Sequence, residues 1–219
     1  MSDTNVPQRL PSGRHRLARE DVIASQRKRL LAATAQAVAD KGYALTTVSD
    51  IVERAGVSRR TFYEQFPGKE ECFLAAYDYG VEIVLGRMAE AARAGEADDW
   101  RARLRSDLET YLQVLAAEPD FAWSLHIEVL GAGQAALERR ATIFELFSER
   151  TRRAHENARA DDPELPELPA EIFRLHTGGM DELIRECLRT RGAAGLPELA
   201  GPAVEMTFAM FGESRAGKR

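Results

Sequence analysis

The sequence predicts an all-α fold, in which a small N-terminal domain of three helices is followed by a larger helical domain. Apolar residues recur at the three- and four-residue spacing of amphipathic helices along most of the 219-residue chain. No segment shows the sustained apolar and polar alternation of a half-buried strand. Glycines and prolines separate the helical stretches. A chain of this length with 44% hydrophobic residues can form one large domain or two modest ones.

The first helix is expected to begin near Asp21 and to end at Gly42, where a glycine can adopt the left-handed cap conformation. Its apolar positions fall on one face. Residues 1–20 mix Pro, Gly, Ser and Arg without periodicity, so we expect a disordered basic tail before this helix.

Two short helices are expected next, each with a hydroxyl residue in position to cap its N-terminus. Thr47 would cap the second helix, which ends at Gly56, and Ser58 would cap the third. The third helix should carry Phe62 and Phe66 into the core, and the Pro67-Gly68 pair should end it. These three helices make the expected domain 21–68.

The remaining chain is expected to form a second helical domain over 69–212, followed by a disordered tail over 213–219. A long fourth helix begins at Lys69 and runs to about Ala94. The segment from Asp161 to Pro169 contains three prolines and is expected to be a loop. The other expected helices are Trp100–Ala117, Pro119–Leu130, Gln134–Ala160, Ala170–Arg191 and Pro197–Phe211.

The formal charge is distributed unevenly along the chain. Residues 1–69 hold twelve Lys or Arg and seven Asp or Glu, a net of +5, whereas residues 70–219 carry a net of −10. A basic N-terminal region is consistent with a surface that faces phosphates. A basic disordered tail beside an acidic surface would give the same numbers, so the charge alone does not decide.

The segment from Thr46 to Phe73 has the spacing of a helix-turn-helix, because the two short helices are joined by the turn Ala55-Gly56-Val57-Ser58. In such a unit the second helix enters the major groove, which is roughly 12 Å wide and admits one α-helix. We therefore expect the third helix to read the base edges of double-stranded DNA.

The candidate DNA contacts lie at the N-termini of the second, third and fourth helices. A guanidinium can bridge guanine O6 and N7 or bind a phosphate, and a helix N-terminus favours an anion. A plain structural interpretation treats the hydroxyl residues as simple caps and the lysine as solvated. The candidates are Thr47, Ser58, Arg59, Arg60, Thr61, Tyr63, Gln65 and Lys69, and the arginines Arg9, Arg14, Arg16 and Arg19 of the tail could also touch DNA.

This region resembles the tetracycline-repressor (TetR) family over about fifty residues. Three positions depart from its usual pattern: Val38 in place of phenylalanine, Arg60 in place of a frequent glycine, and the acidic Glu64 in the third helix. The resemblance is carried by Gly42-Tyr43, Thr46-Thr47-Val48, Ala55-Gly56-Val57-Ser58, Thr61-Phe62-Tyr63, Phe66 and Lys69-Glu70.

The resemblance implies a helical homodimer in which the second domain binds an effector and the last two helices of each subunit form the interface. Gly178-Gly179 is compatible with close backbone approach at such an interface. A small apolar or aromatic effector is expected. Its candidate contacts, each of which could equally be a core residue, are Tyr111, Trp123, His126, Phe144, Phe147, Phe173 and His176.

Several other classes of site are not expected. Cys72 and Cys187 lack a C-x-x-C spacing, so neither a disulfide framework nor a zinc site is predicted, and His126 and His176 lack a metal-binding partner at i+4. No cofactor is expected. No apolar run is long enough to span a membrane and the N-terminus lacks a secretory pattern, so we expect a cytoplasmic protein.

The sequence thus predicts a ligand-responsive, dimeric DNA-binding transcription regulator, acting as a repressor on a palindromic operator. An alternative is a DNA-binding protein without an effector, such as a nucleoid-associated factor that acts through partner contacts. A helical enzyme is disfavoured, because no nucleophile elbow, H-E-x-x-H or P-loop motif is present.

Overall fold

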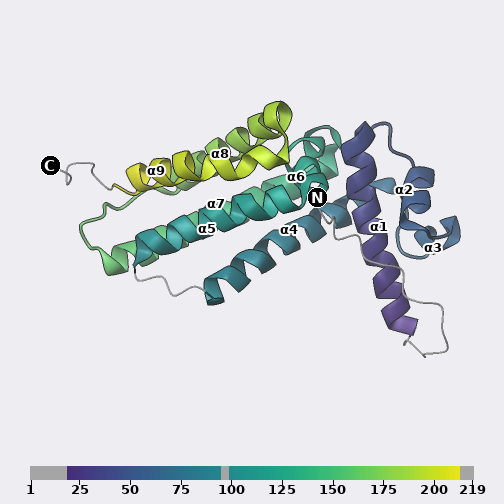
Figure 1. The fold of residues 1–219 in the computed structure, drawn as a ribbon, viewed down its shortest axis with the longest axis horizontal. Helices are drawn as coiled ribbons and strands as arrows, with labels where there is room; N and C mark the ends of the chain where they lie inside the picture. Colours follow the sequence, from purple (N-terminus) through teal and green to yellow (C-terminus); the bar gives the residue numbers. More distant parts are fainter. Residues whose placement is uncertain (1–18, 95–98, 213–219) are drawn as a thin grey trace. The chain divides into compact units, whose positions relative to one another are not determined.

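The computed structural model describes residues 19–94 and 99–212, and every regular element in these ranges is helical, which confirms the all-α prediction (Figure 1). Of the tails expected over 1–20 and 213–219, residues 1–18, with Arg9, Arg14 and Arg16, and residues 213–219 lie outside the described residues. Arg19 and Glu20, expected in the tail, instead belong to the first helix. The helices are α1 (Arg19–Lys41), α2 (Val48–Ala55), α3 (Arg59–Tyr63), α4 (Lys69–Ala94), α5 (Trp100–Ala117), α6 (Pro119–His126), α7 (Gln134–Asp161), α8 (Ala170–Arg191) and α9 (Ala200–Phe211), with 3-10 segments η1 (Glu128–Gly131) and η2 (Ala193–Leu199).

The four helix caps predicted in the N-terminal region are present. Gly42 and Gly56 follow α1 and α2 with φ angles of 81° and 61°, a left-handed conformation that favours glycine. Thr47 and Ser58 are the N-caps of α2 and α3. Local capping chemistry therefore sets this part of the fold.

Three expected helix bounds were wrong. The helix from Pro119 ends at His126 and continues only as η1, and Pro197 lies inside η2 instead of starting the last helix. A 3-10 turn tolerates a proline that would cost an α-helix interior one hydrogen bond. The third helix is shorter than expected, since α3 ends at Tyr63 and Phe66 follows it.

The chain divides into two compact units. The first comprises Met1–Glu82 with Asp120–Leu137, and the second comprises Ile83–Pro119 with Glu138–Arg219. Helix α4 contributes its first half to one unit and its second half to the other. None of the described helices is both long and apolar enough to cross a bilayer.

The first unit has a core in which α1, α2, α3 and the start of α4 meet. Phe62 of α3 is fully buried, and burial of such a side chain contributes about 1.5–3 kcal/mol. Cys72 is buried beside Thr34, with 3.1 Å between the sulfur and the hydroxyl oxygen, and burial raises the pKa of its thiol to about 11. The remaining core members are Leu30, Leu31, Ala33, Ile51, Val52, Ala55, Phe66 and Ala76.

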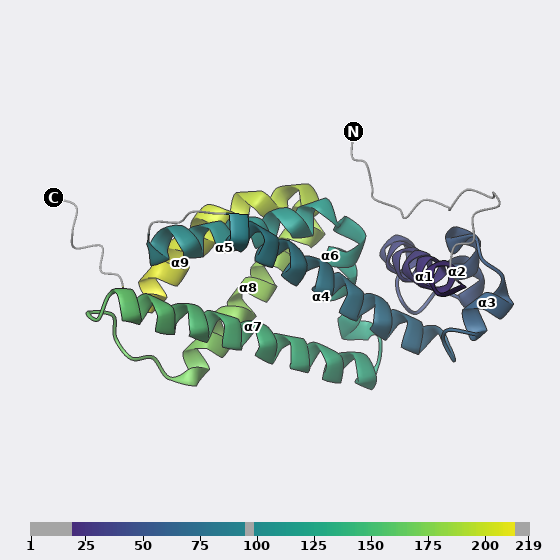
Figure 2. The ribbon, with the colours of Figure 1, turned by 90° about the horizontal axis from the view of Figure 1, so that it is seen from below.

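The second unit is built from long helices. Helix α5 packs against α9 (Figure 2) and against η2. The Ser148 hydroxyl of α7 donates to Thr177 Oγ1 of α8 at 3.0 Å, which joins these two helices. An ion pair of 2.5 Å between Arg140 and Asp181 also links α7 with α8. One end of the unit has an aromatic core with Trp100, Phe173 and Phe211.

Candidate nucleic-acid interface

The turn between α2 and α3 is held by hydrogen bonds from both sides. The Gly56 N–H donates to the carbonyl of Glu53, and Arg29 of α1 donates through Nη1 to the Ala55 carbonyl at 2.6 Å. Phe62 anchors α3 to the core from within. The two helices of the motif are therefore fixed on α1 before any DNA is bound.

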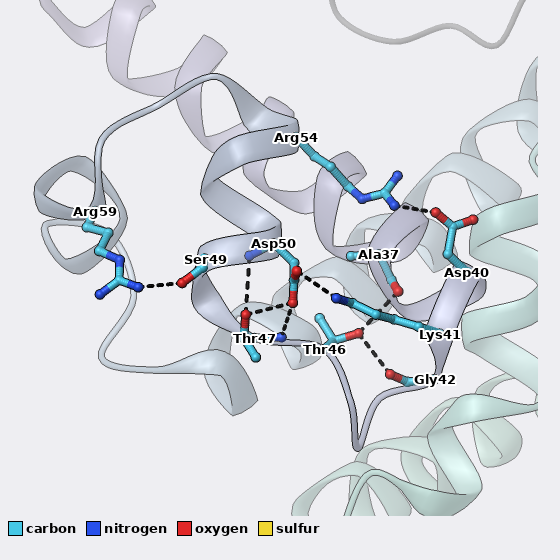
Figure 3. A network of polar contacts seen from close by, with 10 residues as sticks. All are labelled: Ala37, Asp40, Lys41, Gly42, Thr46, Thr47, Ser49, Asp50, Arg54 and Arg59. Atoms are coloured by element: carbon cyan, nitrogen blue, oxygen red, sulfur yellow. Dashed lines mark hydrogen bonds and ion pairs between the residues drawn. The ribbon is translucent and has the colours of Figure 1, made fainter.

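Thr47 caps the N-terminus of α2 through a reciprocal capping box with Asp50. Its hydroxyl accepts from the Asp50 N–H at 3.3 Å, and its own N–H donates to Asp50 Oδ2 at 2.7 Å. Lys41 completes the arrangement, with 2.6 Å from its ammonium to Asp50 Oδ1 (Figure 3). The Lys41 and Thr47 bonds hold the pKa of the Asp50 carboxyl well below its usual range.

Ser58 caps α3 through its hydroxyl, which accepts from the Thr61 N–H at 3.0 Å and lies 2.9 Å from the Thr61 hydroxyl. Ser58 is exposed and Thr61 is half-buried. Ser58 therefore caps α3 and is still exposed at its N-terminus.

Arg59 and Arg60 are exposed on the first turn of α3, as the sequence predicted from their position after the cap. Arg59 donates to the Ser49 hydroxyl of α2 (Figure 3). Arg60 pairs with Glu64 at 2.9 Å along its own helix, an exposed i,i+4 pair of small energetic value. Glu64, the acidic departure from the family's usual pattern, thus forms an ion pair with Arg60.

Tyr63 and Gln65 lie in different environments. The Tyr63 side chain is 57% exposed, and its ring meets the edge of Phe62 at a centroid distance of 5.3 Å. Gln65 is half-buried, and its amide oxygen is buried without a hydrogen-bond partner among the described residues. Tyr63 is thus presented at the surface more fully than Gln65.

Lys69, at the start of α4, contacts the loop between α1 and α2. Its ammonium donates to the Tyr43 carbonyl at 2.8 Å and lies 4.2 Å from the centre of the Tyr43 ring. An ammonium has three donors, so this bond is compatible with an additional phosphate contact. Glu128 of η1 accepts from the Tyr43 N–H on the other side at 2.7 Å.

Sequence reasoning missed three residues of this region. Asp50 stands at the third position of α2, and the spacing Thr-x-x-Asp was a readable capping signal. Leu45, between α1 and α2, is 71% exposed beside Thr46 and Thr47. Glu128 accepts a hydrogen bond from Tyr43, which is 85 positions away in the sequence, and no local sequence pattern predicts a contact of this kind.

The candidate effector residues are divided between the two units. Trp123 and His126 lie on α6 in the first unit, where the Trp123 indole donates to Glu128 Oε1 at 3.1 Å and His126 is buried. The other five, on α5, α7 and α8, lie in the second unit.

Within the second unit the structure brings some of these candidates together. The rings of Tyr111 and Phe147 are 5.5 Å apart, and Phe144 packs over Gly178. Phe173 instead belongs to the aromatic core. No group of three or more His, Cys, Asp or Glu side chains in the described ranges is arranged to hold a metal ion.

His176 is buried on α8 and paired with α9. Its Nε2 lies 2.9 Å from the Thr207 hydroxyl, which itself donates to the Ala203 carbonyl at 2.7 Å. Because the Thr207 hydroxyl proton is used in the bond to Ala203, His176 Nε2 carries the imidazole proton and donates it to the Thr207 oxygen. Burial lowers the pKa of the imidazole to about 4.

Comparison with known proteins supports the helix-turn-helix assignment. The profile for "Bacterial regulatory proteins, tetR family" matches residues 30–76. The transcriptional regulator EthR of Mycobacterium tuberculosis is 33% identical over 144 residues, 64% of this chain and 60% of that protein. The transcriptional activator FasR of Mycolicibacterium smegmatis is 30% identical over 105 residues, 48% of this chain and 47% of FasR. The matches thus span about half to three fifths of these relatives.

Solved structures share the fold at low identity. The fatty acid degradation regulator FadR of Bacillus halodurans superposes with a TM-score of 0.75 at 17% identity, covering 89% of this chain and 97% of that chain. FadR of Bacillus subtilis, solved with stearoyl-CoA, gives 0.71 at 17% identity, covering 85% and 98%. Residues 30–76, which contain the helix-turn-helix, thus match the TetR family of bacterial regulatory proteins, and these findings together support a TetR-family regulator.

Proposed function

We propose that this protein is a ligand-responsive repressor that binds a palindromic DNA operator as a homodimer. The observation that carries the proposal is the arrangement of α3, where Ser58, Arg59, Arg60 and Tyr63 are exposed while Phe62 is fully buried. A helix anchored on one side with a guanidinium-rich, uncovered opposite face fits a major groove. Because such a repressor acts on chromosomal DNA, the location that we propose for it is the cytoplasm.

The DNA-contacting set that we propose is the one predicted from the sequence. Arg59, Arg60 and Tyr63 offer donors at the surface of α3, and Thr47 and Ser58 place helix N-termini where phosphates can be bound. Thr61, Gln65 and Lys69 complete it, with Lys69 also tied to Tyr43.

A homodimer through α8 and α9 is supported by the apolar surface of α8. Leu175 and Leu183 are 70% and 40% exposed, and a Cβ at Gly179, between them along the helix, would meet no atom within 4 Å. These three positions share one helix face because they are four residues apart. An exposed apolar stripe of this kind is typical of a surface that another chain covers.

The effector that we propose is apolar, with Tyr111, Phe144, Phe147, Phe173 and His176 of the second unit as its candidate contacts. FadR of Bacillus subtilis was solved with stearoyl-CoA, which makes a long-chain acyl-CoA the first compound to test. The effector must bind the DNA-free conformation more tightly, because equal affinity for both would shift nothing.

The test is fluorescence anisotropy with a labelled duplex from upstream of the protein's own gene, titrated at several salt concentrations with and without stearoyl-CoA. The proposal predicts tight binding that weakens steeply with salt and is released by the acyl-CoA. Binding that no apolar compound releases would favour an effector-free DNA-binding protein. A promoter-reporter fusion tests the sign of regulation, since FasR is named an activator.

A further inference from the structure

We infer that Glu128 is a positioning residue for DNA binding: its carboxylate holds the loop between α1 and α2 in the conformation that presents Thr47 and α2 to DNA. This inference rests on the proposed DNA-binding function. It concerns contacts within the first unit only, between η1 and the loop over residues 42–47.

Both backbone polar groups of Tyr43 are hydrogen-bonded to charged side chains. Its N–H donates to Glu128 Oε2 at 2.7 Å, and the carbonyl of the same residue accepts from Lys69 Nζ at 2.8 Å. A negative group at the N–H and a positive group at the carbonyl both match the charges of these backbone groups, and charge-assisted bonds are roughly twice as strong as neutral ones. The Tyr43 ring packs on Phe73 at 4.9 Å, which fixes the residue from a third direction.

The carboxylate of Glu128 is itself oriented. Its second oxygen, Oε1, accepts from the Trp123 indole N–H at 3.1 Å, so the two oxygens serve two different donors. Gly42 lies close beside it, where a Cβ would be 3.5 Å from Oε2 and the φ of +81° would strain any other residue. The carboxylate therefore has one defined position against the loop.

Tyr43 is linked to Thr47 through a short turn that is held by its own hydrogen bonds. The Thr46 hydroxyl oxygen lies 2.8 Å from the Gly42 carbonyl oxygen and 3.1 Å from that of Ala37, so its one proton is directed at these two acceptors, and Thr46 is buried (Figure 3). The Thr46 N–H also donates to the Gly42 carbonyl at 3.2 Å. Thr47, the next residue, is the N-cap of α2, so we expect a shift at Tyr43 to move the N-terminus of α2.

The test compares Glu128→Gln with Glu82→Gln, a matched loss of one carboxylate on the exposed side of α4. A glutamine at 128 has one acceptor oxygen, so it would direct an NH2 group at either the Tyr43 or the Trp123 N–H. We expect about tenfold weaker binding to the duplex protected in a footprint. Binding to a scrambled duplex should match that of the control, and the Tyr43 amide should exchange about tenfold faster.

Equal operator affinity of the two variants, or unchanged exchange at Tyr43, would overturn the inference. Should Glu128→Gln fail to fold, Trp123→Phe is the second test, because it removes the indole N–H that orients the carboxylate and keeps an aromatic ring at this position. We then expect about threefold weaker operator binding, and unchanged binding would overturn the inference. A wild-type protein that binds no DNA would contradict the proposed function itself. The failure of the proposed function can thus be distinguished from the failure of the inference about Glu128.

Discussion

Arg59, on the first turn of α3, shows how one residue can be placed by the fold and remain available to DNA. Its bond to the Ser49 hydroxyl ties the guanidinium to α2, and this bond uses one of five N–H donors. A guanidinium held in this way loses less rotational freedom when it meets a base or a phosphate.

Replacement of Arg59 by alanine should weaken specific binding by about 5- to 150-fold, the range expected for a bidentate arginine-guanine contact of roughly 1–3 kcal/mol. Arg87→Ala removes an exposed arginine from α4, where it pairs only weakly with Glu90, and serves as the control for charge. Anisotropy titrations of both variants measure the effect. If both lose affinity equally, Arg59 acts only through its charge.

His176 predicts a pH dependence of stability. Its pKa falls from 6.5 to about 4 on folding because of burial, so the unfolded chain binds more protons between these values. The group therefore contributes stability that is complete above pH 6.5 and is lost as the pH falls toward 4. In urea titrations across this range, His176→Gln should show a flatter pH profile than the wild type; a profile of the same slope would contradict a neutral buried imidazole.

At the scale of elements, the short helices of the motif are defined by local signals. Thr47, Ser58 and Gly56 mark the ends of α2 and α3 by chemistry that acts within a few residues, and for this reason the sequence predicted them. The 3-10 segment around Pro197 and the early end of α6 depend on packing, which no local pattern encodes. The same holds for the bonds of Arg59 and Lys69 and for the grouping of residues 120–137 with the first unit.

Ser58 allows the capping and DNA-binding roles of a helix N-terminus to be separated. Aspartate is as good an N-cap as serine, whereas alanine costs about 1 kcal/mol, so Ser58→Asp should retain the stability that Ser58→Ala loses. DNA binding should follow another order, because a negative charge repels phosphates: serine first, then alanine, then aspartate. Urea unfolding and anisotropy measure the two orders, and identical orders would show that Ser58 is only a cap.

At the scale of the whole molecule, the opposite charges of the two parts of the sequence have a physical consequence. Residues 1–69 carry a net charge of +5 and residues 70–219 a net charge of −10, so the N-terminal region is basic although the overall charge is −5. DNA should be attracted to that region and repelled by the remainder, which restricts the orientations in which a complex can form.

The proposed dimer can be tested on the exposed leucines of α8. Leu175→Glu should shift the protein from dimer to monomer, because a charge in an apolar interface must be desolvated. Leu146→Glu changes an exposed leucine of α7 and should leave the dimer intact. Sedimentation velocity distinguishes the two, and a dimer that survives Leu175→Glu would place the interface elsewhere.

If the face of α3 carrying Arg59 and Tyr63 reads DNA, a DNase I footprint on the DNA upstream of the protein's own gene should reveal it. At moderate salt, we expect the wild-type chain to protect a palindromic segment, and Arg59→Ala at the same concentration to leave it unprotected. A folded, dimeric protein that protects no segment and shows no nonspecific binding would show that this face does not read DNA.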